Sequence, residues 1–169
     1  MTGPFLTRPR RPTAGHTGSS GWWTRATPQA DMVEPGLLLG RFPTRGEREA
    51  LGVRSIVDLT AELPCDTRGA CYRLVPQLDL VTPSHEQLEM AAEAIEASMS
   101  KGPVLVCCAL GFSRSALAVA AWLLRTGRAG NAAEAIARIR SARPAVVLHA
   151  RHIEQVTALE RRLAGRANS

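Results

Sequence analysis

The chain has 169 residues, of which 45% are hydrophobic and 21% charged, and this is enough for one domain with a substantial core. Its longest apolar stretch, Ala116 to Leu124, is far shorter than the roughly 20 residues that cross a bilayer, which excludes membrane insertion through a spanning helix. Four cysteines, two of them adjacent, lack the spacing of a secreted disulfide framework or a metal site. We therefore expect a soluble cytoplasmic protein with no metal and no cofactor.

Residues 1–30 differ in composition from the rest of the chain. They are rich in Pro, Gly, Ser and Thr, contain no acidic residue and hold four arginines, so we predict a disordered basic tail. This tail carries +4 of the net charge of +6, which leaves 6 − 4 = +2 for the remainder. Because the remainder is close to neutral, we expect no nucleic-acid partner. Trp22-Trp23, inside the tail, is expected to pack one ring onto the domain.

From residue 36 onward, short apolar runs alternate with amphipathic segments. The pattern predicts strands at 36–40, 55–59, 72–75 and 104–107, and helices at 45–51, 84–100, 115–124, 132–142 and 150–163. Strands joined by helices favour a parallel arrangement. We therefore expect an α/β domain over residues 31–166, with a central, mostly parallel sheet flanked by helices and a ligand loop at the carboxyl edge of the strands.

A cysteine and an arginine, Cys108 and Arg114, are separated by five residues between a buried strand and an Ala-rich helix. Successive backbone N–H groups in such a loop converge on one point, and the helix N-terminus favours an anion there. The planar guanidinium of Arg114 can hold two phosphate oxygens, while Gly111 allows a backbone conformation that a Cβ resists. We expect Cys108 to be a thiolate at neutral pH, with the hydroxyl of Ser115 near its sulfur.

This loop resembles the His-Cys-x-x-Gly-x-x-Arg-Ser/Thr pattern of the cysteine-dependent protein phosphatases, in particular the dual-specificity branch. The resemblance extends from Val33 to Leu163, and the segment from Leu78 to Val147 is most similar to bacterial dual-specificity domains. Three further segments carry it: 36–40, 51–60 and Arg143-Pro144.

The resemblance implies a protein tyrosine phosphatase-like fold and the hydrolysis of phosphomonoesters, meaning phosphotyrosine and also phosphoserine and phosphothreonine, through a phosphocysteine. Its partner would be a phosphorylated protein or another phosphomonoester. Cys108 would be the nucleophile, Arg114 would stabilise the transferred group and Ser115 would assist the leaving thiolate. The loop residues that would bind phosphate are Ala109, Leu110, Gly111, Phe112, Ser113 and Arg114.

The family also uses a general acid from a loop upstream of the nucleophile's strand. Asp79 is predicted to have this role, because it lies 29 residues before Cys108, between a strand and a helix. The alternative is that Asp79 is only a turn residue. Asp58 and Glu62, near the end of another strand, are weaker candidates.

Cys107 stands where the family has histidine, and this departure leaves other functions open. The domain could bind phosphate without hydrolysing it, or it could act on a phospholipid head group. A third class is thiol redox or sulfur-transfer chemistry, although we favour ordinary thiols for Cys65 and Cys71. The side chains inside the loop are neutral, which favours a substrate with a single phosphoryl group.

Two histidines and several arginines lie on the last predicted helix or just before it. No potential ligands are spaced to join His149 and His152 in a metal site, so solvated helix-end histidines are expected. Arg151 and Arg161 share the helix with Glu154 and other acidic residues, which predicts a solvated face.

Overall fold

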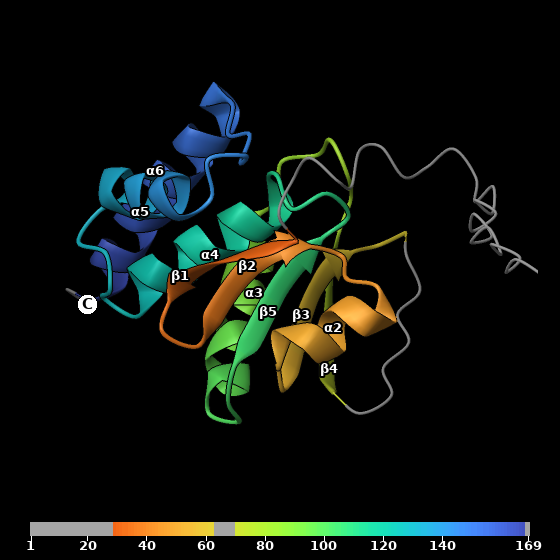
Figure 1. Cartoon of the computed structure of the whole chain (residues 1–169). Coiled ribbons are helices and arrows are strands. Elements are labelled where there is room, and N and C mark those ends of the chain that lie inside the picture. The colour runs from red at the N-terminus through yellow and green to blue at the C-terminus, as the bar shows by residue number, and fades with distance from the viewer. Residues whose placement is uncertain (1–28, 63–69, 168–169) are drawn as a thin grey trace, which may run out of the picture.

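The computed structural model describes residues 29–62 and 70–167, and Figure 1 shows their arrangement around a five-stranded sheet. The strands lie in the order β1-β2-β5-β3-β4. β1 runs antiparallel to β2, and the other neighbouring pairs are parallel. The strands span Ala30–Glu34 (β1), Leu37–Arg41 (β2), Ser55–Thr60 (β3), Cys71–Gln77 (β4) and Val104–Cys108 (β5).

Helices cover both faces of the sheet. The short helix α2 (Arg45–Leu51) lies on one face, and α3 (His85–Met99) and α4 (Arg114–Arg125) pack against the other. The helices α5 (Ala132–Ala142) and α6 (Ala150–Ala167) pack on α4, and α5 also contacts the edge strand β1. The expected α/β architecture with a mostly parallel sheet is confirmed.

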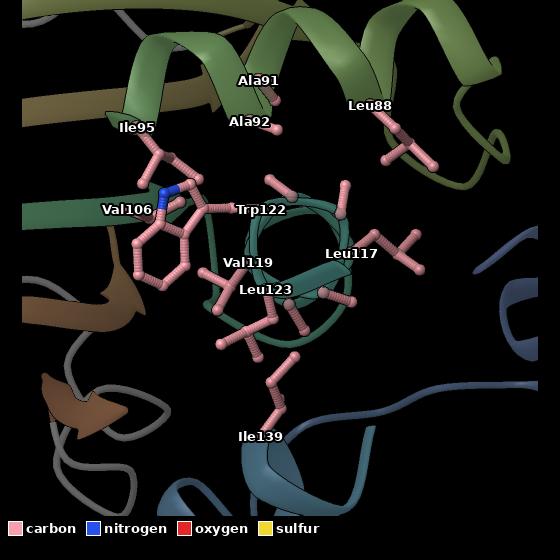
Figure 2. Packing of buried hydrophobic residues seen from close by; sticks show 14 of the residues in the cluster. Leu88, Ala91, Ala92, Ile95, Val106, Leu117, Val119, Trp122, Leu123 and Ile139 are labelled. Carbon is pink, nitrogen blue, oxygen red and sulfur yellow. The ribbon is translucent and has the colours of Figure 1, made fainter. Parts of the chain in front are cut away.

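The central helix α4 is buried on nearly all sides, since its residues 114–123 are shielded from solvent. Figure 2 looks along it, with α3 above and Ile139 of α5 below. The fully buried Trp122 fills the space between α4 and α3, and its indole N–H donates to Glu96 at 2.7 Å. This packing holds the first turn of α4 in a fixed position relative to the end of β5.

Three helix starts have capping side chains that the sequence provides, and at α2 Thr44 forms a capping box with Glu47. Ser84 accepts from the backbone N–H of Gln87, whose side chain accepts from the Ser84 backbone, which makes a capping box at α3. Asn131 caps α5 by accepting from the Glu134 N–H at 2.9 Å.

The strand β1 was not predicted. Its side chains are only half-buried or exposed, and its sequence therefore has no apolar run like those of the other strands. Its backbone pairs antiparallel with β2 at the edge of the sheet. Residues 1–28, which include most of the predicted tail with Trp22-Trp23, lie outside the described residues, and so does Cys65.

None of the described helices is both long enough and apolar enough to cross a membrane.

Candidate active site

The loop that joins β5 to α4 holds the predicted cysteine and arginine. Cys108 is the last residue of β5 and Arg114 is the first residue of α4, so residues 109–113 form the turn between them. The Sγ atom of Cys108 lies 3.3 Å from the Oγ atom of Ser115. The structure therefore brings Cys108, Arg114 and Ser115 together as the sequence predicted.

Hydrogen bonds from outside the loop fix its carbonyl groups. The Phe42 N–H donates to the Cys108 carbonyl at 2.8 Å, and the Val147 N–H donates to the Phe112 carbonyl at 3.0 Å. In a trans peptide the N–H points away from the C=O of the preceding residue. These contacts therefore turn the N–H groups of Ala109 and Ser113 away from the surrounding protein, toward the inside of the loop.

Gly111 allows the loop to lie against the end of β2. Its φ is +70°, a left-handed value, and an added Cβ would lie 2.5 Å from the Gly40 carbonyl carbon and 2.6 Å from the Arg41 nitrogen. Because both neighbours are backbone atoms, they cannot move aside as a flexible side chain could. The glycine that the sequence singled out is therefore required by both conformation and space.

A buried arginine ties the loop to β1. Arg143 is fully buried; its Nε donates to the Gly111 carbonyl at 3.0 Å, and its Nη1 donates to Asp31 of β1 at 2.6 Å. This contact makes the edge strand part of the support for the loop.

The amide N–H groups of residues 109–113 donate to no acceptor within the part of the chain that the structure describes. Ser113, at the N-cap of α4, also makes no side-chain capping bond to the helix. A set of convergent amides at a helix N-terminus is a binding site for an anion. The loop is therefore a candidate site for a phosphate-like anion.

The Arg114 guanidinium lies between two acidic side chains. It donates to Glu62 through Nη1 and Nη2, at 3.0 and 2.8 Å, and its Nη1 also donates to the Gln77 carbonyl at 3.0 Å. Nη2 lies 3.4 Å from a carboxylate oxygen of Asp79. Two segments that follow different strands therefore hold Arg114 in place.

The charges in this cluster stabilise one another. Burial alone would lower the pKa of Arg114, but the hydrogen bond to Glu62 and the negative charges of Cys108, Asp79 and Glu62 raise it above its ordinary value. The hydrogen bond from Arg114 in turn lowers the pKa of Glu62. Glu62 is thus an anion at neutral pH, and both of its carboxylate oxygens accept hydrogen bonds from Arg114.

Asp79 lies in the segment between β4 and α3, with 60% of its side chain exposed. The next residue, Leu80, has a φ of +61°, which is uncommon for a residue with a Cβ and marks local backbone strain. The structure therefore places the predicted acid beside Arg114 in an exposed, strained loop.

A cavity of about 230 Å³ opens above the loop. Cys108, the loop and Asp79 line it, together with residues at the start of α6. The predicted nucleophile Cys108, Arg114 and the predicted acid Asp79 thus line the same cavity.

Three of the other residues considered from sequence have roles that the sequence did not show. Asp58 is buried and accepts from Tyr72 and from the Thr60 N–H, so it is a structural carboxylate. Glu62 positions Arg114, and no local sequence signal marked that contact because the two residues are 52 positions apart. Cys107 points to the opposite face of the sheet from Cys108, where it packs with Ile56 and Leu105.

One expectation about the last helix is wrong. His152 is only 6% exposed and lines the cavity, whereas a solvated position was expected. His149 is exposed as predicted. No cluster of three or more His, Cys, Asp or Glu side chains suited to a metal ion is found among the described residues.

Comparison with known proteins agrees with this geometry. The family model described as "Dual specificity phosphatase, catalytic domain" matches residues 39–162. The structure of Tk-PTP in its active form is 28% identical, with a TM-score of 0.71, and the match covers 80% of this chain and 98% of that one. Human DUSP28 is 29% identical, with a TM-score of 0.72, covering 81% and 96%. A mouse putative dual specificity phosphatase complexed with zinc tungstate is 27% identical, with a TM-score of 0.73, covering 92% and 97%.

Replacement of Gly111 by Ala tests the construction of the loop. The added Cβ must displace the end of β2 or the loop itself, so we expect the affinity for inorganic phosphate, measured by calorimetry, to fall by tenfold or more. Gly127→Ala is the matched control, because Gly127 also has a positive φ but no atom lies within 4 Å of its added Cβ. Equal phosphate affinity in the two variants would contradict the close approach.

Proposed function

Because the chain belongs to the dual-specificity phosphatase family, a family of cysteine-dependent hydrolases, we propose that it hydrolyses phosphotyrosine, and also phosphoserine and phosphothreonine, in proteins. The observation that carries the proposal is that Cys108, Arg114 and the loop residues Ala109, Leu110, Phe112 and Ser113 line one cavity, while the loop amides have no acceptor among the described residues. A nucleophile that must remain a reduced thiol also favours a cytoplasmic location.

In the first step, the loop amides and Arg114 hold the three terminal oxygens of the phosphoryl group. The Cys108 thiolate attacks phosphorus, the S–P bond forms and the P–O bond to the leaving group breaks. Asp79 gives its proton to the leaving oxygen. Its place in the lining of the same cavity as Cys108, 3.4 Å from Arg114, supports this role.

In the second step, water attacks the phosphocysteine. Asp79, now a carboxylate, takes a proton from the water, the O–P bond forms and the S–P bond breaks. The hydroxyl of Ser115, 3.3 Å from the sulfur, donates a hydrogen bond to the departing thiolate. The products are inorganic phosphate and the regenerated enzyme.

The leaving group that the cavity fits best is an aromatic ring. The apolar side chains that line the same cavity as Cys108 include Leu80, Val81, Leu110 and Val147. All four are exposed, from 43% for Val147 to 81% for Leu80. The group attached to the phosphate is an apolar ring in phosphotyrosine and a polar head group in a phospholipid, so the lining favours tyrosine.

Cys108→Ser tests the nucleophile. The wild-type protein should hydrolyse an aryl phosphate in the presence of a chelator, because the loop and Arg114 supply the positive charge. The variant should lose this activity while it still binds inorganic phosphate, because a serine hydroxyl remains protonated in a site without a general base for it. Substantial remaining hydrolysis would assign the nucleophile to another residue.

Asp79→Asn tests the general acid. The amide keeps the size of the carboxyl but cannot give a proton, so kcat should fall by about 10² or more for a phosphotyrosine peptide. The loss should be smaller for an aryl phosphate with an acidic leaving group, which departs without a proton. Glu49→Gln, which removes an exposed carboxylate of α2, is the control. An unchanged rate with the phosphotyrosine peptide would eliminate Asp79 as the acid and leave it as a turn residue.

Glu62→Gln tests the positioning of Arg114. The amide can accept one hydrogen bond but cannot form a charged, two-point contact, so the guanidinium should be less well oriented for the transition state. We expect kcat to fall by roughly tenfold with a smaller change in KM. Glu62→Asp, which keeps the charge, should retain part of the activity, and equal rates in all three proteins would show that Glu62 has no part in catalysis.

A further inference from the structure

The strand β4 lies at an edge of the sheet, opposite to the edge that β1 forms (Figure 1). Among the described strands it pairs only with β3, and the Cys71 N–H donates to the Arg54 carbonyl at 3.0 Å, so Cys71 faces β3. Successive residues of a strand direct their backbone groups to opposite sides, so Leu74 faces away from β3. Its N–H and C=O have no partner within the described ranges, and another strand can pair with them.

A groove of about 440 Å³ accompanies this edge. Most of its lining is apolar and comes from two elements, with Leu74 and Val75 of β4 facing Met90, Ala94 and Ala97 of α3. Leu74 and Met90 are 52% and 56% exposed. An open strand edge beside an apolar groove can bind an extended peptide, since the edge pairs with the peptide backbone and the groove receives alternate side chains.

The charges in the groove favour an acidic peptide. Its lining contains two charged residues, Arg73 and Glu93, and Glu93 already pairs with Arg125 at 2.8 Å. Arg73 has no ion pair in the part of the chain that the structure describes, and its Nε is buried without a hydrogen-bond acceptor. A buried donor without an acceptor costs free energy, and a carboxylate can accept from a guanidinium at two points. The groove therefore fits a segment that brings an acidic side chain to Arg73.

Strand pairing determines where that acidic residue lies in the segment. In an antiparallel pair, which is slightly more stable than a parallel one, the residue opposite Leu74 exchanges two hydrogen bonds with it. The residues before and after it then lie opposite Val75 and Arg73, and their side chains point to the same face of the sheet as these two. An apolar residue and an acidic residue two positions later therefore match Val75 and Arg73.

Neither the N-terminal tail nor a second copy of this chain provides the matching acid. Residues 1–28 contain four arginines and no acidic residue. In a second copy, pairing of the two Leu74 residues places Arg73 opposite Val75. Pairing centred on Arg73 places two guanidinium groups opposite each other, which is unfavourable. The charge of the groove therefore favours a segment of a different protein.

The strand β4 also leads from the groove to the active-site cavity. Asp79, which lines that cavity, follows Leu74 by five residues, a distance of at most about 17 Å in an extended chain. A connection of ten residues can extend to about 33 Å. A protein that binds at Leu74 can therefore also place a phosphorylated residue in the cavity.

We propose that the groove formed by β4 and α3 is a docking site for an extended segment of the protein substrate, in which an acidic residue follows an apolar one by two positions. That the partner is the substrate rests on the proposed function. Leu74 pairs with the backbone of the segment, the apolar lining receives its apolar side chain, and Arg73 binds its carboxylate.

A peptide without phosphate tests the docking site separately from catalysis. The probe has the sequence Val-Thr-Glu between flanking Ser and Thr residues, and a second probe has Gln in place of Glu. Binding to the full chain is measured by fluorescence anisotropy. We expect the Glu probe to bind roughly fivefold more tightly, the size typical of a partly exposed charged pair. The variant Arg73→Ala should bind both probes equally.

Arg161→Ala is the matched control, because it removes the same charge from an exposed position on α6 that does not line the groove. Its preference for the Glu probe should equal that of the wild type. A similar loss in both arginine variants would reduce the effect to net charge and overturn the role of Arg73. Equal affinity of the wild type for the two probes would overturn the docking site.

Methylation of the probe's backbone tests strand pairing without any change to the protein. An N-methyl group on the Thr removes the N–H that would donate to the Leu74 carbonyl, so binding should be lost. An N-methyl group on the Glu changes an N–H that points away from β4, so binding should be kept. Equal affinity of the two methylated probes would contradict pairing with the edge of β4.

Hydrolysis tests whether the docked partner is the substrate. A phosphotyrosine peptide is joined to each probe by ten Gly and Ser residues, and KM should be lower for the Glu version in the wild type but not in Arg73→Ala. An inactive protein that keeps the Arg73-dependent preference for the Glu probe would overturn the proposed function while it supports the groove. Equal KM values despite that preference would overturn the substrate as the partner, and self-association that the Glu probe disrupts would assign the edge to a second copy.

Discussion

The close contact between the backbones of Gly111 and Gly40 is the constraint on which the site depends. It places the turn between β5 and α4 directly on the end of β2, where neither position has room for a Cβ. Gly40 is in turn covered by the chain at Gln29 and Ala30, whose atoms would lie 2.3 and 2.7 Å from a Cβ there. The loop at Gly111 therefore rests on β2 at Gly40, and β2 rests there on the chain at Gln29 and Ala30.

This support determines the direction of the loop's polar groups. The carbonyls of Cys108, Gly111 and Phe112 are held by donors from Phe42, Arg143 and Val147, which belong to three different parts of the chain. With the carbonyls bound on the outside, the amides of residues 109–113 remain for an anion on the inside. A site assembled before the ligand arrives loses less entropy when the ligand binds.

Arg114 shows how a buried charge is stabilised in this site. A guanidinium with only 5% of its side chain exposed needs anionic partners, and Glu62 and Asp79 provide them from segments that follow β3 and β4. The two carboxylates differ in their contacts. Glu62 forms a two-point contact that holds Arg114, while the more exposed Asp79 touches one edge and stays accessible to a leaving group.

Adjacent cysteines in the same strand have separate environments for a simple geometric reason. Side chains alternate across a strand, so Cys108 lies with the core that includes α4, and Cys107 lies on the α2 face. The residue that departs from the family pattern, Cys107, therefore lies on the face of the sheet away from Cys108.

Local patterns in the sequence were sufficient to predict most elements and the central motif. Apolar runs and amphipathic periods placed β2, β3, β4, β5 and the helices within a few residues, because burial of both faces of the sheet leaves a strong hydrophobic signal. The loop was predicted from the spacing of four residues, Cys108, Gly111, Arg114 and Ser115. They lie within eight consecutive residues, so their pattern is visible in the local sequence. The edge strand β1 escaped prediction because its half-buried side chains carry little of that signal.

Only the tertiary structure decided the contacts between distant segments. The pairing of Glu62 with Arg114, the support of the loop by Arg143 and Asp31, and the burial of His152 beside the cavity join residues whose local sequences show nothing unusual. The physical reason is that each contact depends on how α4, α5 and α6 pack against one another and against the sheet. The sequence by itself therefore determined the fold class and the loop that holds Cys108 and Arg114, and the packing of the helices decided what surrounds that loop.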